Sequence, residues 1–209
     1  MAVTATVTSV HVSERAGAYL AVVKIAILNQ TFPPDVVASA QYVGDLAKEL
    51  CALGHDVTVI ASRRGYDDTS ARFPASAHWH GVRVLRVGGS GFGKGARWRR
   101  AADFSSFLLT CWFRLLRQGR FSVVVALTSP PLVSFLAALF VRLRGGRLVL
   151  WVLDLNPDAA VAAGWMRSDS VATRVLEFCL AYSLRTAEQV VVLDRFMKAR
   201  VDLKLATTA

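Results

Sequence analysis

The sequence predicts an α/β fold, a doubly wound parallel sheet in a single domain, and three observations support this prediction. At 209 residues the chain is long enough for one sizeable domain. Short apolar runs rich in β-branched residues alternate along it with helical patterns. The runs are apolar without interruption, as in strands that helices cover on both faces. Together these features describe a Rossmann-like arrangement.

Each strand and helix is predicted from its own stretch of sequence. Six apolar runs are predicted as strands, at residues 22–28, 56–61, 81–87, 121–127, 147–153 and 189–193. The helical patterns between them lie at residues 38–54, 96–118, 132–143 and 170–185, and a last helix follows residue 193. Gly54 ends the first helix as a C-cap, and Gly145-Gly146 closes the third.

One uncharged stretch, residues 123–141, is about long enough to span a bilayer. Ser129-Pro130-Pro131 divides it in the middle, where a helix could not continue. We therefore predict a buried strand, a turn and a helix here rather than a membrane-spanning segment.

Composition and charge exclude some classes of protein. Hydrophobic residues make up 54% of the chain and charged residues 19%, which excludes general disorder. The net charge is +10, and residues 94–120 contribute +6 of it, from seven basic residues and one acid. A basic stretch of this kind predicts an anionic neighbour.

The domain boundaries are predicted at residues 22 and 201. Residues 1–21 are expected to be a disordered leader and not a signal peptide, since His11, Glu14 and Arg15 interrupt any apolar core. Residues 202–209 are expected to be a tail. The three cysteines form no CxxC pair and lie in apolar helical patterns, so we expect a reducing cytoplasm and no disulfides.

In a doubly wound sheet, ligands bind outside the carboxyl ends of the strands, so the residues that follow each strand are informative. Asp154 ends the fifth predicted strand, and Asp158 follows in the first turn of the next helix. A buried strand end rarely keeps an unpaired acid without a use, so Asp154 is the expected catalytic residue. For Asp158, helix capping and substrate binding both remain open.

Two other patterns suggest sites of a different kind. Residues 88–95 give the spacing G-x-x-x-x-G-K of a nucleotide-binding P-loop, but position 95 is glycine where the motif needs Ser or Thr. A flexible glycine loop is the alternative. His78-Trp79-His80 offers two histidines without a third ligand, so we expect a loop edge and no metal site.

The basic helix at residues 96–118 combines arginines with aromatic side chains, which favours contact with an anionic membrane surface. An ordinary amphipathic helix of the sheet's outer layer is the alternative. Its apolar content exceeds what phosphate contact needs, so no nucleic-acid partner is expected. The residues expected at the membrane are Arg97, Trp98, Arg99, Arg100, Trp112, Arg114 and Arg117.

Three segments, residues 27–63, 126–164 and 177–201, together resemble the N-terminal domain of glycosyltransferase family 4, which has the GT-B fold. The likeness is to the branch that builds bacterial cell-surface polysaccharides. It rests on FPPD after the first strand and on D-L-x-P-D after the fifth.

The resemblance implies transfer of a sugar from a nucleotide-sugar donor to an acceptor, often one linked to polyprenyl diphosphate at the inner face of the cell membrane. The implied localisation is cytoplasmic and peripheral, and no cofactor beyond the nucleotide-sugar substrate is implied. Asp154 would orient the acceptor or the reacting sugar. The residues that would line the cleft are Phe32, Pro33, Pro34, Asp35, Ser39 and Ser129, with Asp158 beside them.

Members of this family continue into a second domain that holds the nucleotide with a Glu-x7-Glu pair, and no two glutamates here are eight apart. The resemblance therefore implies that the donor is held by a C-terminal domain, either lost by truncation or encoded separately, and turnover by this chain alone is not expected without that domain. A non-catalytic module that binds a membrane surface or an acceptor is the alternative function. A degenerate P-loop nucleotide binder is the third.

Overall fold

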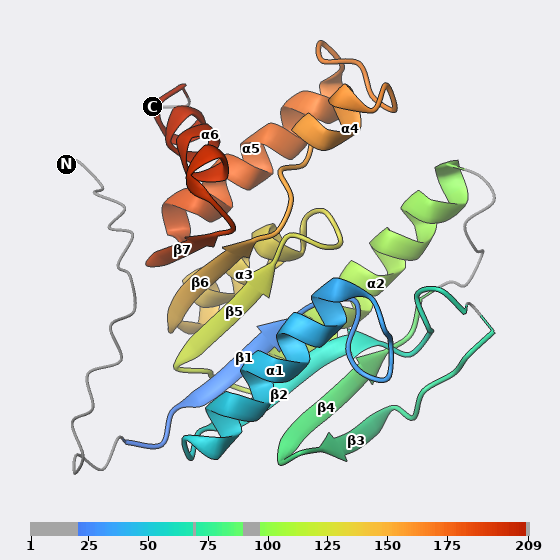
Figure 1. The fold of residues 1–209 in the computed structure, drawn as a ribbon, viewed down its shortest axis with the longest axis vertical. Coiled ribbons are helices and arrows are strands. Elements are labelled where there is room, and N and C mark those ends of the chain that lie inside the picture. The colour runs from blue at the N-terminus through green and yellow to red at the C-terminus, as the bar shows by residue number, and fades with distance from the viewer. Residues whose placement is uncertain (1–20, 69, 90–96, 208–209) are drawn as a thin grey trace.

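The computed structural model describes residues 21–68, 70–89 and 97–207, and only the backbone of residues 97–101 and 207. Residues 1–20 of the expected leader and residues 90–96 of the glycine loop lie outside the described residues. Figure 1 shows one twisted sheet flanked by helices. The predicted α/β class is confirmed.

The sheet has seven strands in the order β3-β4-β2-β1-β5-β6-β7. All neighbours pair in parallel except β3 and β4, which are antiparallel. Chain order reverses direction between β1 and β5, which makes the sheet doubly wound as predicted. The strands are Lys24–Leu28 (β1), Asp56–Ser62 (β2), Ser76–Trp79 (β3), Val82–Val87 (β4), Val123–Leu127 (β5), Arg147–Val152 (β6) and Gln189–Val192 (β7).

The helices begin and end close to their predicted bounds. Gly54 adopts a φ of 86° just beyond α1, and its N–H donates to the carbonyl of Cys51, so the predicted C-cap is confirmed. The helices are Ala38–Ala52 (α1), Arg97–Arg117 (α2), Val133–Arg144 (α3), Asp158–Ala162 (α4), Val171–Thr186 (α5) and Arg195–Thr207 (α6).

Alternate residues of the strands enter two separate cores. Ile25, Ile27 and Val59 pack with α1 on one face, and Ala26 and Leu28 pack with α2 and α3 on the other. Figure 1 shows α1 in front of the sheet and α3 behind it. This two-sided burial explains the uninterrupted apolar runs in the sequence.

The expected loop edge at His78-Trp79-His80 is wrong, because His78 and Trp79 belong to β3. His80 and Gly81 turn the chain back into β4, with φ angles of 48° and 84°. Two such residues between antiparallel strands form a tight hairpin turn. In the part of the chain that the structure describes, no group of three or more His, Cys, Asp or Glu side chains could hold a metal ion.

The expected tail is also corrected. Residues 202–207 continue α6, whose Val201 is buried in the third core cluster with Leu180 and Leu184 of α5. Lys204 lies in an ion pair with Asp158, at 2.6 Å between Nζ and Oδ1. The helix is thus part of the domain beyond residue 201.

The cysteines lie in α1, α2 and α5 without disulfide partners. Cys111 and Cys179 are buried and Cys51 is half-buried. Burial raises the pKa of the Cys111 thiol to about 12, so this residue behaves as an unreactive apolar side chain.

The uncharged stretch 123–141 forms β5, a turn and most of α3, as predicted. Among the described residues there is no helix of the length and apolarity that crossing a bilayer requires.

Candidate functional site

The reversal of strand order between β1 and β5 leaves their following loops side by side at the carboxyl edge of the sheet. The N–H of Gln30, after β1, donates to the carbonyl of Ser129, after β5, at 3.4 Å. A crevice between such loops is the usual ligand site in a doubly wound sheet. Three of the predicted segments, after β1, β5 and β6, meet at this edge.

The FPPD loop after β1 is attached to the core by its first residue. Phe32 has 0% exposure and packs edge-on against Trp79 of β3, with ring centroids 5.3 Å apart. Gly44 of α1 allows the loop to approach, since an added Cβ would lie 3.0 Å from Cγ of Pro33 and 3.3 Å from the Trp79 ring. The side chain of Phe32, predicted to line the cleft, has no exposed surface that a ligand could contact.

A buried arginine of β4, which sequence reasoning missed, binds the backbone of the same loop. Arg86 is 6% exposed and donates to the carbonyls of Pro33 at 2.6 Å, Phe32 at 3.4 Å and Ser62 at 2.9 Å. Its guanidinium also lies over the ring of Phe73, 4.3 Å from the centroid. Arg86 therefore fixes the loop through its backbone.

The charge of Arg86 is only partly balanced. Burial lowers the pKa of the guanidinium, and the neighbouring Asp35 carboxylate opposes that shift. An arginine remains protonated under all ordinary conditions, so the site keeps a buried positive charge beneath the loop.

The other predicted residues of this loop differ in their accessibility. Pro34 is exposed, whereas Pro33 and Asp35 are half-buried. Asp35 accepts a hydrogen bond through Oδ1 from the N–H of Tyr66, at 3.0 Å, and so connects the loop to the segment after β2. Ser39, in the first turn of α1, shares a hydrogen bond with Thr31 at 2.9 Å between hydroxyl oxygens.

Three buried acceptor oxygens in and beside the loop have no hydrogen-bond donor among the described residues. They are Oδ1 of Asn29, Oε1 of Gln30 and Oδ2 of Asp35. Each costs about 1–3 kcal/mol unless water or a ligand supplies a donor. The loop is thus rich in acceptors at the point where the strand order reverses.

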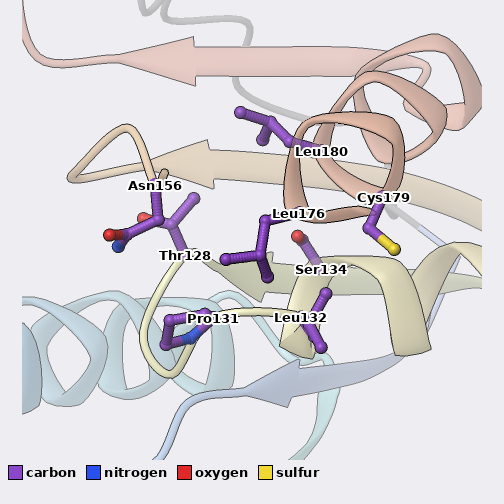
Figure 2. Close-up of a pocket in the computed structure, with 8 residues that line it drawn as sticks. All are labelled: Thr128, Pro131, Leu132, Ser134, Asn156, Leu176, Cys179 and Leu180. Atoms are coloured by element: carbon purple, nitrogen blue, oxygen red, sulfur yellow. The ribbon is translucent and has the colours of Figure 1, made fainter. Parts of the chain in front are cut away.

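Thr128, directly after β5, joins that strand to the segment after β6. Its hydroxyl oxygen accepts the N–H groups of Leu153 and Asp154, both at 3.2 Å. Beneath it lies a cavity of about 20 Å³, which Figure 2 shows with Thr128, Ser134 and Asn156 among its lining residues. This cavity holds one water molecule at most, and it is too small for a sugar or a nucleotide.

Asp154, the predicted catalytic residue, lies just beyond β6. Its carboxyl group is half-buried and accepts from Nδ2 of Asn156 at 3.2 Å. Burial raises its pKa, and hydrogen bonds from the Thr128 hydroxyl and from Asn156 partly offset this effect. No cationic side chain of the described residues lies within ion-pair distance of it. Asp154 is thus a half-buried acid at the sheet edge whose charge is stabilised by hydrogen bonds and not by an ion pair with any described residue.

Asp154 opens into a groove of about 390 Å³ between α4 and α6, at the carboxyl ends of β6 and β7. Asp158, Asp194, Phe196 and Arg200 are among the other lining residues. The groove is of the size that encloses a small ligand.

Asp158, for which capping and substrate binding were both open, makes no side-chain cap of α4. Its carboxylate instead binds Lys204 of α6, and the two side chains are 29% and 19% exposed. The pair holds the two walls of the groove together.

Of the seven side chains of α2 that are predicted to contact a membrane, the structure describes three. Trp112 packs partly against the core, and Arg114 is half-buried, while Arg117 is exposed. The side chains that point outward are Leu109 and Phe113, at 58% and 49% exposure. The side chains of Arg97, Trp98, Arg99 and Arg100 lie outside the described residues, so their membrane contact remains an expectation.

The hypothetical P-loop also cannot be placed, because residues 90–96, with Lys94, lie outside the described residues. Gly88 and Gly89 follow β4 without entering a helix, and the carbonyl of Gly88 accepts from the Thr110 hydroxyl at 2.8 Å.

Comparisons with known proteins agree with the resemblance. Probable glycosyltransferase WbjE of Pseudomonas aeruginosa is 33% identical over 89 residues, which make up 43% of this chain and 22% of WbjE. The matched region thus spans about a fifth of that relative.

Among solved structures, the chain is similar to the catalytic domain of starch synthase IV from Arabidopsis thaliana, bound to ADP and acarbose. It matches with a TM-score of 0.45 and 14% identity, over 63% of this chain and 34% of that one. A TM-score of this size supports no argument about the site. The sequence model of the glycosyl transferase 4-like domain family matches residues 37–205 of this chain. Because this match covers most of its length, the chain belongs to the glycosyl transferase 4-like domain family.

Proposed function

We propose that this domain is the acceptor-side half of a glycosyltransferase that moves a hexosyl group from a nucleotide sugar to an acceptor in cell-surface polysaccharide synthesis. The single observation that supports it best is Asp154, an acid with a raised pKa and no cationic partner among the described residues. It lines a groove at the sheet edge where a doubly wound fold binds ligands.

Asp154 orients the acceptor in this proposal. Its carboxylate accepts a hydrogen bond from the acceptor hydroxyl and points the oxygen toward the sugar. The bond between sugar C1 and the diphosphate oxygen breaks, and a bond between C1 and the acceptor oxygen forms. The acceptor proton passes to the leaving diphosphate, as family resemblance implies for a retaining enzyme. In this mechanism the domain accelerates transfer mainly because it holds the acceptor hydroxyl close to the sugar and in the right orientation.

The loops beside Asp154 form the wall of the cleft. After β1 the wall consists of exposed Pro34 and half-buried Asp35, while Ser39 and Ser129 flank it. The unpartnered acceptors of Asn29 and Gln30 suit a ligand or ordered water that donates hydrogen bonds. The donor nucleotide is held by a C-terminal domain, in the same chain or another, and no cofactor takes part.

The acceptor in this proposal is linked to polyprenyl diphosphate, and the domain works at the cytoplasmic face of the membrane. The outward Leu109 and Phe113 of α2, with exposed Arg117, provide apolar and basic contacts for an anionic lipid surface. We expect salt-sensitive co-sedimentation with phosphatidylglycerol vesicles that Phe113→Ser weakens and Ser105→Ala leaves unchanged. Equal binding by both variants would place the membrane contact elsewhere.

The direct test of the function is a transfer assay. The domain, together with a C-terminal nucleotide-sugar domain supplied in cis or as a separate chain, is incubated with nucleotide sugars and polyprenyl-diphosphate acceptors. We expect a glycosylated lipid product by mass spectrometry, and we expect Asp154→Asn to abolish it without loss of folding. Acceptor binding without any product would favour the non-catalytic module instead.

A further inference from the structure

The groove between α4 and α6 has one wall that the proposed function does not use. That wall is the first part of α6, which follows β7 and presents Phe196, Met197 and Arg200 to the groove. Phe196 and Arg200 are four residues apart, so they lie on the same face of the helix.

Phe196 is an exposed aromatic ring at the rim of the groove. It is 69% exposed, although an apolar ring of this size is usually buried. The guanidinium of Arg195 lies over the ring, 4.9 Å from its centroid, in a cation–π contact. The ring therefore offers an oriented apolar surface next to the polar groups of the groove.

The polar groups of the groove include both acceptors and a donor. Asp154 has no cationic partner among the described residues, and Asp194 uses Oδ1 to accept the N–H of Met197 at 2.7 Å, which leaves Oδ2 as an acceptor. Arg200 is exposed, with no acidic partner in the described ranges, and is a donor. The charge of Asp158 is offset by Lys204.

This balance of charge disfavours a diphosphate in the groove. Two carboxylates, Asp154 and Asp194, line the groove with one guanidinium, Arg200, and the guanidinium of Arg195 lies over the Phe196 ring at the rim. These cations are matched by the carboxylates, so the groove has no excess positive charge to neutralise a diphosphate. A neutral ring that carries hydroxyl groups suits the same set, because hydroxyls both donate and accept hydrogen bonds.

We propose that the groove between α4 and α6 is a sugar-ring subsite, in which Phe196 packs against the C–H face of a pyranose. Asp154 and Asp194 accept hydrogen bonds from its hydroxyl groups, and Arg200 donates to a ring substituent or hydroxyl oxygen. The role of this subsite in transfer rests on the proposed function, with the bound ring being the acceptor sugar; the binding itself does not. The diphosphate of a lipid-linked acceptor then lies outside the groove.

Saturation-transfer NMR with the full chain tests the subsite without any transfer reaction. The probes are the methyl glycosides of glucose, galactose, mannose and N-acetylglucosamine, with pyrophosphate as the competing anion. We expect at least one glycoside to bind, and Phe196→Ala to weaken it about fivefold. Phe178→Ala is the matched control, since Phe178 is 65% exposed on α5 away from the groove.

Arg200→Met supplies a second variant, for which we expect weaker glycoside binding and an unchanged melting temperature. The subsite is wrong if no glycoside binds at tens of millimolar, if Phe196→Ala binds as Phe178→Ala does, or if pyrophosphate displaces the glycoside.

The subsite and the proposed function fail in distinguishable ways. In the transfer assay Phe196→Ala is expected to raise the KM for the acceptor while kcat is largely kept. If Phe196→Ala transfers sugar with an unchanged KM for the acceptor, the subsite proposal is wrong and the glycosyltransferase proposal stands. If glycosides bind in a way that depends on Phe196 but no transfer is observed under any condition, the subsite proposal stands and the proposed reaction is wrong.

Discussion

Two segments at the same edge of the sheet differ in how fully their polar groups are paired within the protein. In the loop after β1, Arg86 binds the backbone carbonyls, Asp35 binds the N–H of Tyr66, and Phe32 enters the core. In the segment after β6, Asp154 keeps a half-buried carboxyl group without a cationic partner and faces a groove. The first segment is fixed by the protein, whereas the second leaves an acceptor for a ligand.

The difference shows that a recognisable motif and a contact residue need not coincide. FPPD is the more conspicuous pattern in the sequence, but its aromatic residue is structural and its backbone is the part that Arg86 holds. Asp154 is a single acid at the end of an ordinary apolar run, and its raised pKa and its place in the groove make it the better candidate for the proposed catalytic residue. Substitutions in the loop after β1 and in the segment after β6 test this difference.

The largest effect is expected at Phe32. Phe32→Ala removes a fully buried ring from its contact with Trp79, and should lower the free energy of unfolding by about 3–5 kcal/mol. Urea denaturation measures this change. Val36→Ala, at an exposed position directly after the same loop, serves as the control and should cost less than about 0.5 kcal/mol. Equal effects at the two positions would mean that Phe32 does not anchor the loop.

A smaller loss of stability is expected at Arg86. Arg86→Met leaves carbonyls of Phe32, Pro33 and Ser62 without their donor, and should cost about 2–4 kcal/mol in urea denaturation. Arg86→Lys keeps the charge with fewer hydrogen bonds and should cost less. Arg63→Met, at an exposed arginine, is the control. A methionine variant as stable as the control would contradict the role of Arg86 in holding the loop.

The ion pair across the groove should contribute about 1 kcal/mol. Lys204→Met and Asp158→Asn are each expected to lower stability, and the double variant should lose less than the sum of the two, since each single change leaves one partner unpaired. A thermodynamic cycle from thermal unfolding measures the coupling. Strict additivity would show that the pair does not join α4 to α6.

The smallest effect on stability is expected at Asp154, and it should depend on pH. Because its pKa is raised in the folded state, its contribution to stability falls as pH rises from the unfolded value of about 3.9 through the folded value. Asp154→Asn cannot ionise, so the variant should gain melting temperature relative to the wild type between about pH 4 and pH 7. A constant difference over this range would mean that burial does not oppose ionisation of Asp154.

Most of the fold was predictable because its determinants are local. Predominantly apolar runs predicted all six parallel strands, even β4 with its two arginines, and Gly54 marked the end of α1 correctly. The missed strand β3 lies at the sheet edge and has only four residues, so its alternation of polar and apolar side chains is too short to stand out. Its signal was the pair His80-Gly81, since glycine at the second position of a two-residue turn favours a hairpin.

The site was less predictable because it depends on contacts between distant segments. Asp154 follows from its place after a strand, but its partner Thr128 lies 26 positions away in the sequence. Arg86 reaches the FPPD loop across 53 positions, and nothing in the strand that contains it marks it as buried. Phe196 and Arg200 lie within the predicted last helix, but the groove that they line depends on the packing of α6 beside α4, which no local pattern indicates.

The most direct test of this account is to compare Asp154→Asn with Asp35→Asn in the same transfer assay, each with its melting temperature. We predict that Asp154→Asn abolishes product formation at an unchanged or higher melting temperature at neutral pH. Asp35→Asn should lower the melting temperature while it retains measurable transfer, because Asp35 connects two loops. Full transfer by Asp154→Asn, or complete loss confined to Asp35→Asn, would contradict the assignment of the acceptor site to the groove beside β6.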